Sequence, residues 1–210
     1  MEQHRPHQET TGQEKTGQEK TDQDPNDQTL MTAVAQSKNQ QSHAVLLSSQ
    51  QALDQLMQRY GDSLYTYALR LSQNAHQAED LCQDTWLRVW QQAASFDPNK
   101  SQLNTWLHRV LHNLFVDAYR LAKNKPTEAL GLEDFESEVP QMTEQAQSLT
   151  HALNNLPTEQ RAVLLLKHSQ GFSNPEVAQI VGASIRAVES LAARAKTSLR
   201  RKLEGTAHDQ

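Results

Sequence analysis

Cysteine and long apolar runs are what this 210-residue chain has least of. Its single cysteine, Cys82, excludes an internal disulfide. No window approaches the roughly 18 apolar residues of a membrane span, and the N-terminus lacks the basic and apolar segments of a signal peptide. Only 36% of the residues are hydrophobic, so part of the chain lies outside any packed core. These absences predict a soluble cytoplasmic protein with unpacked segments.

The first unpacked segment is the N-terminus. Residues 1–42 contain the near-repeat TGQEK-TGQEK-TDQD and are rich in Gln, Thr and Asp. We expect them to form a disordered polar tail. Because Met31 lies inside this segment, it is an alternative translation start, and the sequence leaves the choice between Met1 and Met31 open.

Residues 43–125 carry four helical patterns, enough to enclose one small core. The first two are separated by a break at Gly61-Asp62. The third begins near residue 75 and ends near Phe96, because Asp97-Pro98-Asn99 is a turn signal, and the fourth begins after Ser101. The third helix buries a tryptophan-rich stripe and exposes acidic and polar residues, whereas the fourth helix has basic residues on its polar face.

An acidic segment, residues 126–148, comes next. It holds six acidic residues and no lysine or arginine, and we expect it to be a flexible linker. Its acidity either keeps the chain soluble or screens the basic surfaces beside it by imitating nucleic acid. The net charge of −5 thus arises in the tail and linker, while the two helical parts are close to neutral or basic.

Residues 149–205 predict a second helical domain that contains a helix-turn-helix. Ser173 and Glu176 form a capping box, and Gly182 supplies the turn before a last helix capped by Ser184. The spacing of small and apolar residues fits the way in which two such helices pack. Cationic and small polar side chains on the last helix can contact base edges and phosphates. A helical hairpin need not bind DNA, but the basic residues favour DNA binding.

Several residues that could bind a ligand or a metal are explained more simply as core or surface residues. Trp86 and Trp90 are expected in the core, and Trp106 either belongs to the core or lines a nucleic-acid channel. His108 and His112 are four residues apart, yet no third metal ligand lies near them in sequence. We expect no metal site, no cofactor and no catalytic residues, since no nucleophile or phosphate-binding motif is present.

Together the two helical parts resemble regions 2 and 4 of bacterial extracytoplasmic-function (ECF) sigma factors. The resemblance is carried by LYTYALRLSQNAHQAEDLCQDTWLRVWQ, by FDPNKSQLNTWLHRVLHNLFVDAYR, and by the stretch from LNNLPTEQRAVLLL to RRKL. It covers about residues 50–125 and 149–203. It implies an all-α protein of two helical bundle domains and a function in promoter recognition by RNA polymerase, without enzymatic activity.

The resemblance implies three sets of functional residues. Those that dock on the β′ clamp helices of the polymerase are Asp80, Gln83, Asp84, Leu87 and Arg88. Those that open the −10 promoter element and capture an unstacked base are Lys100, Asn104, Trp106, Arg109, Asn113 and Arg120. Those that contact the −35 element are Ser184, Arg186, Ala187, Ser190, Arg194 and Lys196. Glu189 and Leu191 stand where many family members have basic residues, so phosphate contacts fall to Arg186, Arg194 and Lys196.

The implied partners are core RNA polymerase, through its β′ clamp helices and β flap, promoter DNA, and an anti-sigma factor that is often membrane-anchored. The linker would lie along the RNA path of the polymerase. Two other functions stay open: a helix-turn-helix regulator that acts without polymerase, and a sigma-like decoy that sequesters an anti-sigma factor. The first leaves the acidic helix without a purpose, and the basic C-terminal residues argue against the second.

Overall fold

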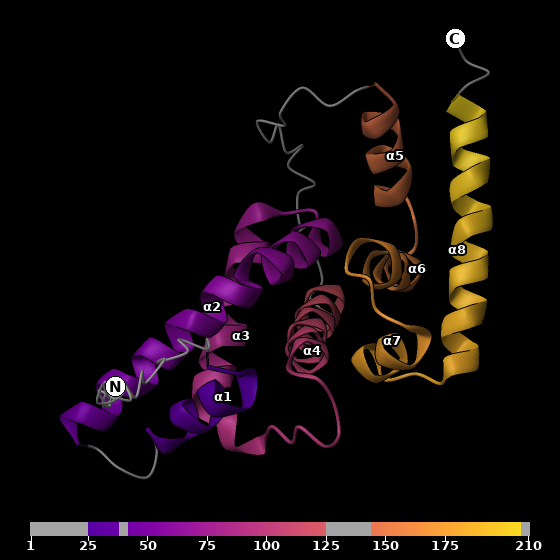
Figure 1. Ribbon diagram of the computed structural model, residues 1–210. Coiled ribbons are helices and arrows are strands. Elements are labelled where there is room, and N and C mark those ends of the chain that lie inside the picture. The colour runs from indigo at the N-terminus through magenta and orange to yellow at the C-terminus, as the bar shows by residue number, and fades with distance from the viewer. Residues whose placement is uncertain (1–24, 38–41, 125–143, 207–210) are drawn as a thin grey trace, which may run out of the picture.

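The computed structural model describes residues 25–37, 42–124 and 144–206. Every regular element in these ranges is helical, which confirms the expected all-α class (Figure 1). The elements are α1 (Asp27–Gln36), α2 (His43–Ser72), α3 (Ala75–Gln92), the 3₁₀ turn η1 (Ala93–Ser95), α4 (Leu103–Asn124), α5 (Glu144–Asn154), α6 (Thr158–Leu164), the π-helical turn η2 (Leu165–Ser169), α7 (Asn174–Val181) and α8 (Ile185–Thr206).

The first domain is a bundle of α1 to α4, and α2 is its longest helix. The predicted break at Gly61 is wrong, because α2 continues through it without interruption. Leu56 and Leu64 lie on either side of Gly61 and are completely buried. A glycine inside a helix costs about 1 kcal/mol relative to alanine, and the burial of two leucines outweighs that cost.

Helix α1 corrects the expectation that all of residues 1–42 form a disordered tail. Leu30, Met31 and Val34 are buried in the core shared with α2 and α3. The Asn26 side chain caps the helix by accepting from the Thr29 amide at 2.9 Å. This helix could not be recognised from the sequence, because it has only three closely spaced buried apolar residues and the sequence around them is polar. Residues 1–24 lie outside the described part of the chain.

The second domain, α5 to α8, forms as its local signals predict. Ser173 and Glu176 make the capping box of α7, and Gly182 ends that helix at φ 67°, a left-handed conformation that favours glycine. The Ser184 hydroxyl accepts from the Ala187 amide at 3.2 Å at the start of α8. Helix α5 begins at Glu144, so the last residues of the expected 126–148 linker are helical. The rest of that linker, up to residue 143, is not described.

The two domains pack against each other through α4 and α7 (Figure 1). A single cluster of buried apolar residues runs from Leu30 in α1 to Val188 and Ala192 in α8, so the core is continuous across both domains. Helix α4 lies in the middle of this arrangement, with α3 on one side and α7 on the other (Figure 1). Side chains of α4 therefore contact both domains.

The burial of α1 predicts a stability effect. Leu30 is 3% exposed, and Leu30→Ala is expected to lower the free energy of unfolding by about 2–5 kcal/mol, as is typical of a buried leucine. Leu47, 46% exposed on α2, is the matched control, and Leu47→Ala should change stability by less than about 0.5 kcal/mol. Urea unfolding followed by circular dichroism measures both. Equal effects of the two substitutions would contradict the assignment of α1 to the core.

Candidate functional site

The first candidate surface is the outer face of α3. Its inner face, which includes Leu81, Trp86 and Val89, is buried against the rest of the first domain. All five residues expected to dock on polymerase are exposed on the other side of the helix: Asp80, Gln83, Asp84, Leu87 and Arg88. Trp90 packs at the edge of the core, so both predicted core tryptophans of this helix are confirmed.

The chemistry of this α3 face combines acidic residues with an exposed leucine. Leu87 is 53% exposed, one of the most exposed large apolar side chains in the described ranges. Asp80 lies 3.5 Å from His76, both on the surface, and Asp84 forms no ion pair within the described residues. An apolar side chain among accessible carboxylates suits a partner that presents basic and apolar groups together.

The second candidate surface is formed by residues 97–102 and α4. The Asp97 carboxylate accepts from the Asn99 amide at 3.0 Å and lies 3.4 Å from the Lys100 ammonium. The hydrogen bond from the Asn99 amide, followed by the interaction with the Lys100 ammonium, lowers the pKa of Asp97. The predicted −10 residues that α4 leaves exposed share one stripe of the helix, namely Arg109, Asn113 and Arg120.

Trp106, the aromatic residue assigned to the −10 set, is buried. It is 7% exposed and packs edge-on against Phe96, with ring centroids 5.8 Å apart. Its indole therefore contributes to the core in this conformation, in line with the first of its two expected roles. Asn104 is half-buried, and its Oδ1 atom is shielded from solvent without a hydrogen-bond partner among the described residues.

A cleft of about 330 Å³ lies between α1 and residues 96–104. Its walls include Phe96 from the loop, Asn104 from the start of α4, Asn26 and Gln28 from the N-cap and first turn of α1, and Tyr60 from α2. Sequence reasoning missed the α1 and α2 side of this cleft, because no motif linked the N-terminal segment to the loop. An aromatic side chain with several amide groups is a suitable lining for a flat, hydrogen-bonding ligand such as a nucleobase.

A buried polar stripe of α4 faces the second domain. His108 lies between Tyr67 of α2, at a ring-centroid distance of 5.5 Å, and Phe172 of the second domain, at 4.8 Å. Its Nδ1 is 3.0 Å from the Asn104 carbonyl oxygen, which can only accept, so Nδ1 carries the proton. His112 Nδ1 lies 2.9 Å from the Tyr67 hydroxyl. Burial lowers the pKa of each histidine to about 4, so both are neutral at pH 7.

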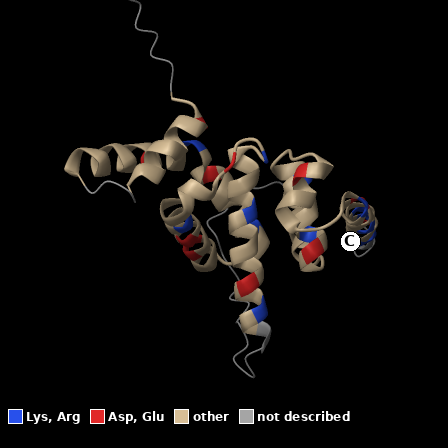
Figure 2. Cartoon of the chain, turned by 90° about the horizontal axis from the view of Figure 1, so that it is seen from below, with Lys and Arg blue, Asp and Glu red and all other residues tan. Residues whose placement is uncertain are grey.

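The third candidate surface is the first half of α8. Val188, Ala192 and Ala195 hold the helix on α6 and α7. The Glu189 carboxylate accepts from the Asn174 side chain at 3.4 Å, so this acidic residue contacts the preceding helix. Figure 2 shows Lys and Arg positions along α8 beside the C-terminus. Of the predicted −35 residues, Ala187 is half-buried and the others are exposed: Ser184, Arg186, Ser190, Arg194 and Lys196.

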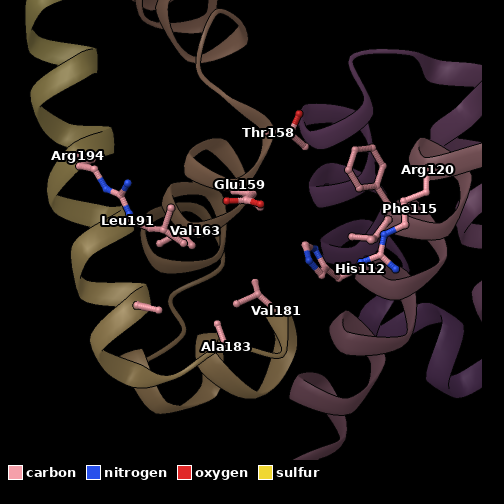
Figure 3. Close-up of a pocket in the computed structure, with 13 residues that line it drawn as sticks. His112, Phe115, Arg120, Thr158, Glu159, Val163, Val181, Ala183, Leu191 and Arg194 are labelled. Atoms are coloured by element: carbon pink, nitrogen blue, oxygen red, sulfur yellow. The ribbon is translucent and has the colours of Figure 1, made fainter. Parts of the chain in front are cut away.

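The structure brings one residue of the −10 set and one of the −35 set to the same cavity. A pocket of about 440 Å³ lies between α4 and the second domain. Arg120 from α4 and Arg194 from α8 lie on opposite sides of it, with His112, Phe115 and Leu191 among the residues between them (Figure 3). Arg120 and Arg194 therefore lie at the contact between the domains, whereas most of the other candidate DNA-binding residues lie outside this pocket.

Neither a metal-binding cluster nor a membrane-spanning helix is found in the described ranges. His, Cys, Asp and Glu side chains form no group of three that could hold a metal ion there. None of the helices described is long and apolar enough to cross a membrane.

Comparison with known proteins places both domains. The family described as Sigma-70 region 2 matches residues 56–125, and Sigma-70, region 4 matches residues 146–199. SigM of Mycobacterium tuberculosis is 32% identical over 79% of this chain and 87% of its own length. EcfG of Rhodopseudomonas palustris is 35% identical over 65% of this chain and 77% of its length. SigE of Mycolicibacterium smegmatis is 34% identical over 70% of this chain, which spans 60% of SigE.

Solved structures agree with these relatives. The sigma factor RpoE of Bartonella quintana, in complex with the anti-sigma factor NepR, has a TM-score of 0.60 and 28% identity over 72% of this chain and 96% of its own. CnrH, in complex with the cytosolic domain of CnrY, has a TM-score of 0.60 and 25% identity, and the match covers 85% of this chain and 97% of CnrH. The fold is thus that of a protein built from sigma-70 regions 2 and 4. This chain belongs to the ECF RNA polymerase sigma factors.

The buried histidines predict how stability depends on pH. Well above pH 6.5 both imidazoles are neutral whether the chain is folded or unfolded, so they add no pH dependence to the free energy of unfolding. Between pH 6.5 and 4 the unfolded chain binds more protons, because the folded-state pKa of His108 and His112 is about 4. The free energy of unfolding should therefore fall on acidification, by about 2 kcal/mol per histidine at pH 5.

Urea unfolding at pH 7.5, 6.0 and 5.0 measures this fall. His108→Gln, which can still donate to the Asn104 carbonyl, should remove about half of it. The exposed His76 offers the control, and His76→Gln should leave it unchanged. If the free energy of unfolding depends on pH equally in the wild type, His108→Gln and His76→Gln, the fall on acidification does not come from the buried histidines.

Proposed function

We propose that this chain is a promoter-selecting sigma factor: it binds core RNA polymerase through its first domain and directs initiation by contacting the −10 and −35 elements. The observation that carries the proposal is the α3 face, on which Asp80, Asp84, Leu87 and their neighbours are exposed together. A regulator that only binds DNA has no use for an acidic and apolar surface on the domain without the helix-turn-helix. The sigma-70 region matches of both domains support the proposal.

On this proposal the α3 face docks on the β′ clamp helices. The carboxylates of Asp80 and Asp84 meet basic residues there, while Leu87 supplies the apolar contact at the centre. The second domain contributes a further contact, with the β flap. The protein itself forms and breaks no covalent bond, because its part is to position the polymerase on DNA.

The −10 element is engaged by α4 and the cleft beside it. Arg109, Asn113 and Arg120 form an exposed polar and cationic stripe along which single-stranded DNA can lie. An unstacked base enters the cleft beside Phe96, where the unpartnered Oδ1 of Asn104 accepts from an exocyclic amino group. Lys100 at the loop tip contacts the backbone phosphates.

The −35 element is recognised by α8. Arg186 and Ser190 lie within the first two turns, where side chains of a recognition helix reach base edges in the major groove. Arg194 and Lys196 come later and contact phosphates, which supports affinity more than selectivity.

Regulation by an anti-sigma factor follows from the relatives. RpoE was solved with the anti-sigma factor NepR, and CnrH was solved with the cytosolic domain of CnrY. We infer that an anti-sigma factor holds this chain inactive until a signal releases it, and that the protein works in the cytoplasm, where polymerase and DNA are found. That this partner is membrane-anchored, and that residues 126–143 follow the RNA path of the polymerase, stay predictions.

The docking assignment is tested by charge reversal. Asp84→Arg should weaken binding to core polymerase at least about 10-fold, because it places like charges at the contact. Asp54, exposed on α2, allows the same change of charge elsewhere, and Asp54→Arg should bind normally. Affinity is measured with labelled protein and purified core enzyme. Equal affinities would contradict the docking surface, and retained duplex DNA binding together with absent core binding in the wild type would favour a plain regulator.

The −35 assignment is tested by comparing two arginines. Arg186→Ala should reduce discrimination between the preferred −35 sequence and altered ones by about 1–3 kcal/mol. Arg194→Ala should instead weaken binding to all −35 sequences about equally and reduce the dependence of binding on salt. Initiation on promoter variants at several salt concentrations distinguishes these outcomes. Unchanged selectivity in Arg186→Ala would exclude its role in base recognition.

A further inference from the structure

Helix α1 places an acidic side chain in the wall of the cleft beside residues 96–104. Asp27, the first residue of α1, lines this cleft together with Tyr60 of α2 and Asn104 of α4. The −10 contacts proposed above all come from residues 96–120, so they leave the α1 side of the cleft without a function.

The Asp27 carboxylate is held in place by two donors from α2. The Tyr60 hydroxyl donates to its Oδ2 atom, and the Arg59 guanidinium donates to its Oδ1 atom at 3.1 Å. Burial, followed by the hydrogen bond to Asp27, raises the pKa of the Tyr60 hydroxyl, which therefore stays protonated and continues to donate. Each carboxylate oxygen has a second lone pair, so Asp27 can still accept a hydrogen bond from a ligand in the cleft.

Arg59 also offsets the charge of Asp27, with which it forms a partly exposed ion pair. An isolated carboxylate would repel the phosphates of a bound DNA strand, whereas a carboxylate paired with an arginine adds little net charge. Asp27 can therefore take part in recognising a base without opposing the binding of the strand.

The cleft has the size and the lining for one base. Its volume of about 330 Å³ is at the small end of ligand pockets, and Phe96 and Tyr60 supply aromatic rings from the loop and from α2. The Oδ1 atom of Asn104 is shielded from solvent and has no hydrogen-bond partner among the described residues. An acceptor left unpaired away from water is costly, so a donating ligand is favoured there. Asp27 adds a second acceptor on the α1 side.

Acceptors on two sides of a cleft discriminate between bases. Adenine, cytosine and guanine each carry an exocyclic amino group, which donates to such acceptors. Thymine carries no amino group, and its carbonyl oxygens can only accept. A thymine in this cleft would leave acceptors facing acceptors away from water, which is unfavourable.

Resting on the proposed function, we propose that Asp27 is a specificity-determining residue for the −10 element: with Asn104 it selects a captured base that carries an amino group and rejects thymine. Tyr60 and Arg59 position the carboxylate, while Asp27 contacts the base. Helix α1 is then part of the promoter-recognition surface, although residues 27–36 lie outside the segment that matches Sigma-70 region 2.

The test is initiation by the full-length protein with core polymerase on promoters that carry each of the four bases in turn at every −10 position. Asn104→Ala identifies the captured position, because base preference should change there. At this position the wild type should use thymine about 10- to 100-fold less well than the preferred base. The side-chain amide of Asp27→Asn can donate to a thymine carbonyl, so this variant should reduce the difference to less than about 3-fold.

Two further variants separate the carboxylate from the folding of α1. Tyr60→Phe keeps the ring but removes the donor that holds Asp27, and it should relax the rejection of thymine in part. Thr29 lies in the first turn of α1 but not in the wall of the cleft, and its hydroxyl donates to Asn26 at 3.0 Å. Thr29→Ala weakens the start of the helix and should keep the base preference of the wild type.

The proposal is overturned if Asp27→Asn rejects thymine as strongly as the wild type does, or if it changes base preference at a position other than the one changed by Asn104→Ala. It is overturned as well if Asn104→Ala changes preference at no position, or if Thr29→Ala relaxes preference as much as Asp27→Asn does. Failure of the proposed function looks different: the wild type then initiates from none of the promoters, and the role of Asp27 is refuted with it.

Discussion

The packing of α4 is the constraint on which the rest of the structure depends. Leu107 and Leu111 on one side of the helix are completely buried in the first domain. His108 on the next side is buried against Phe172 of the second domain, and a third stripe carries the exposed residues of the −10 set. One helix thus contributes to the core, to the domain contact and to a candidate DNA-binding surface. A change in the contact between the domains therefore changes the surroundings of Arg120, the member of that set that lines the interdomain pocket.

The three candidate surfaces differ in how accessible they are. All five predicted docking residues of the α3 face are exposed. The outward residues of α8, such as Arg186, are accessible as well, whereas Arg120 and Arg194 share an interdomain pocket.

The sequence predicted those parts of the fold that depend on local signals. The capping box at Ser173 and the turn at Gly182 were visible because each rests on a few adjacent residues. Helix α1 was missed because its stability comes from the burial of Leu30 and its neighbours against distant parts of the chain. The α1 wall of the cleft and the packing of His108 against Phe172 depend on contacts of the same long-range kind. Periodicity along one helix does not show which residues cover that helix. The roles of individual site residues stay predictions.

Run-off transcription with purified core polymerase, this protein and promoter-length fragments of its own genome tests the central claim most directly. The account predicts initiation at a small set of sites that share −10 and −35 sequences, dependent on the presence of this protein. Tight binding to core polymerase without initiation would contradict that claim and favour a sigma-like decoy. Duplex DNA binding without any binding to core polymerase would contradict it as well and favour a plain regulator.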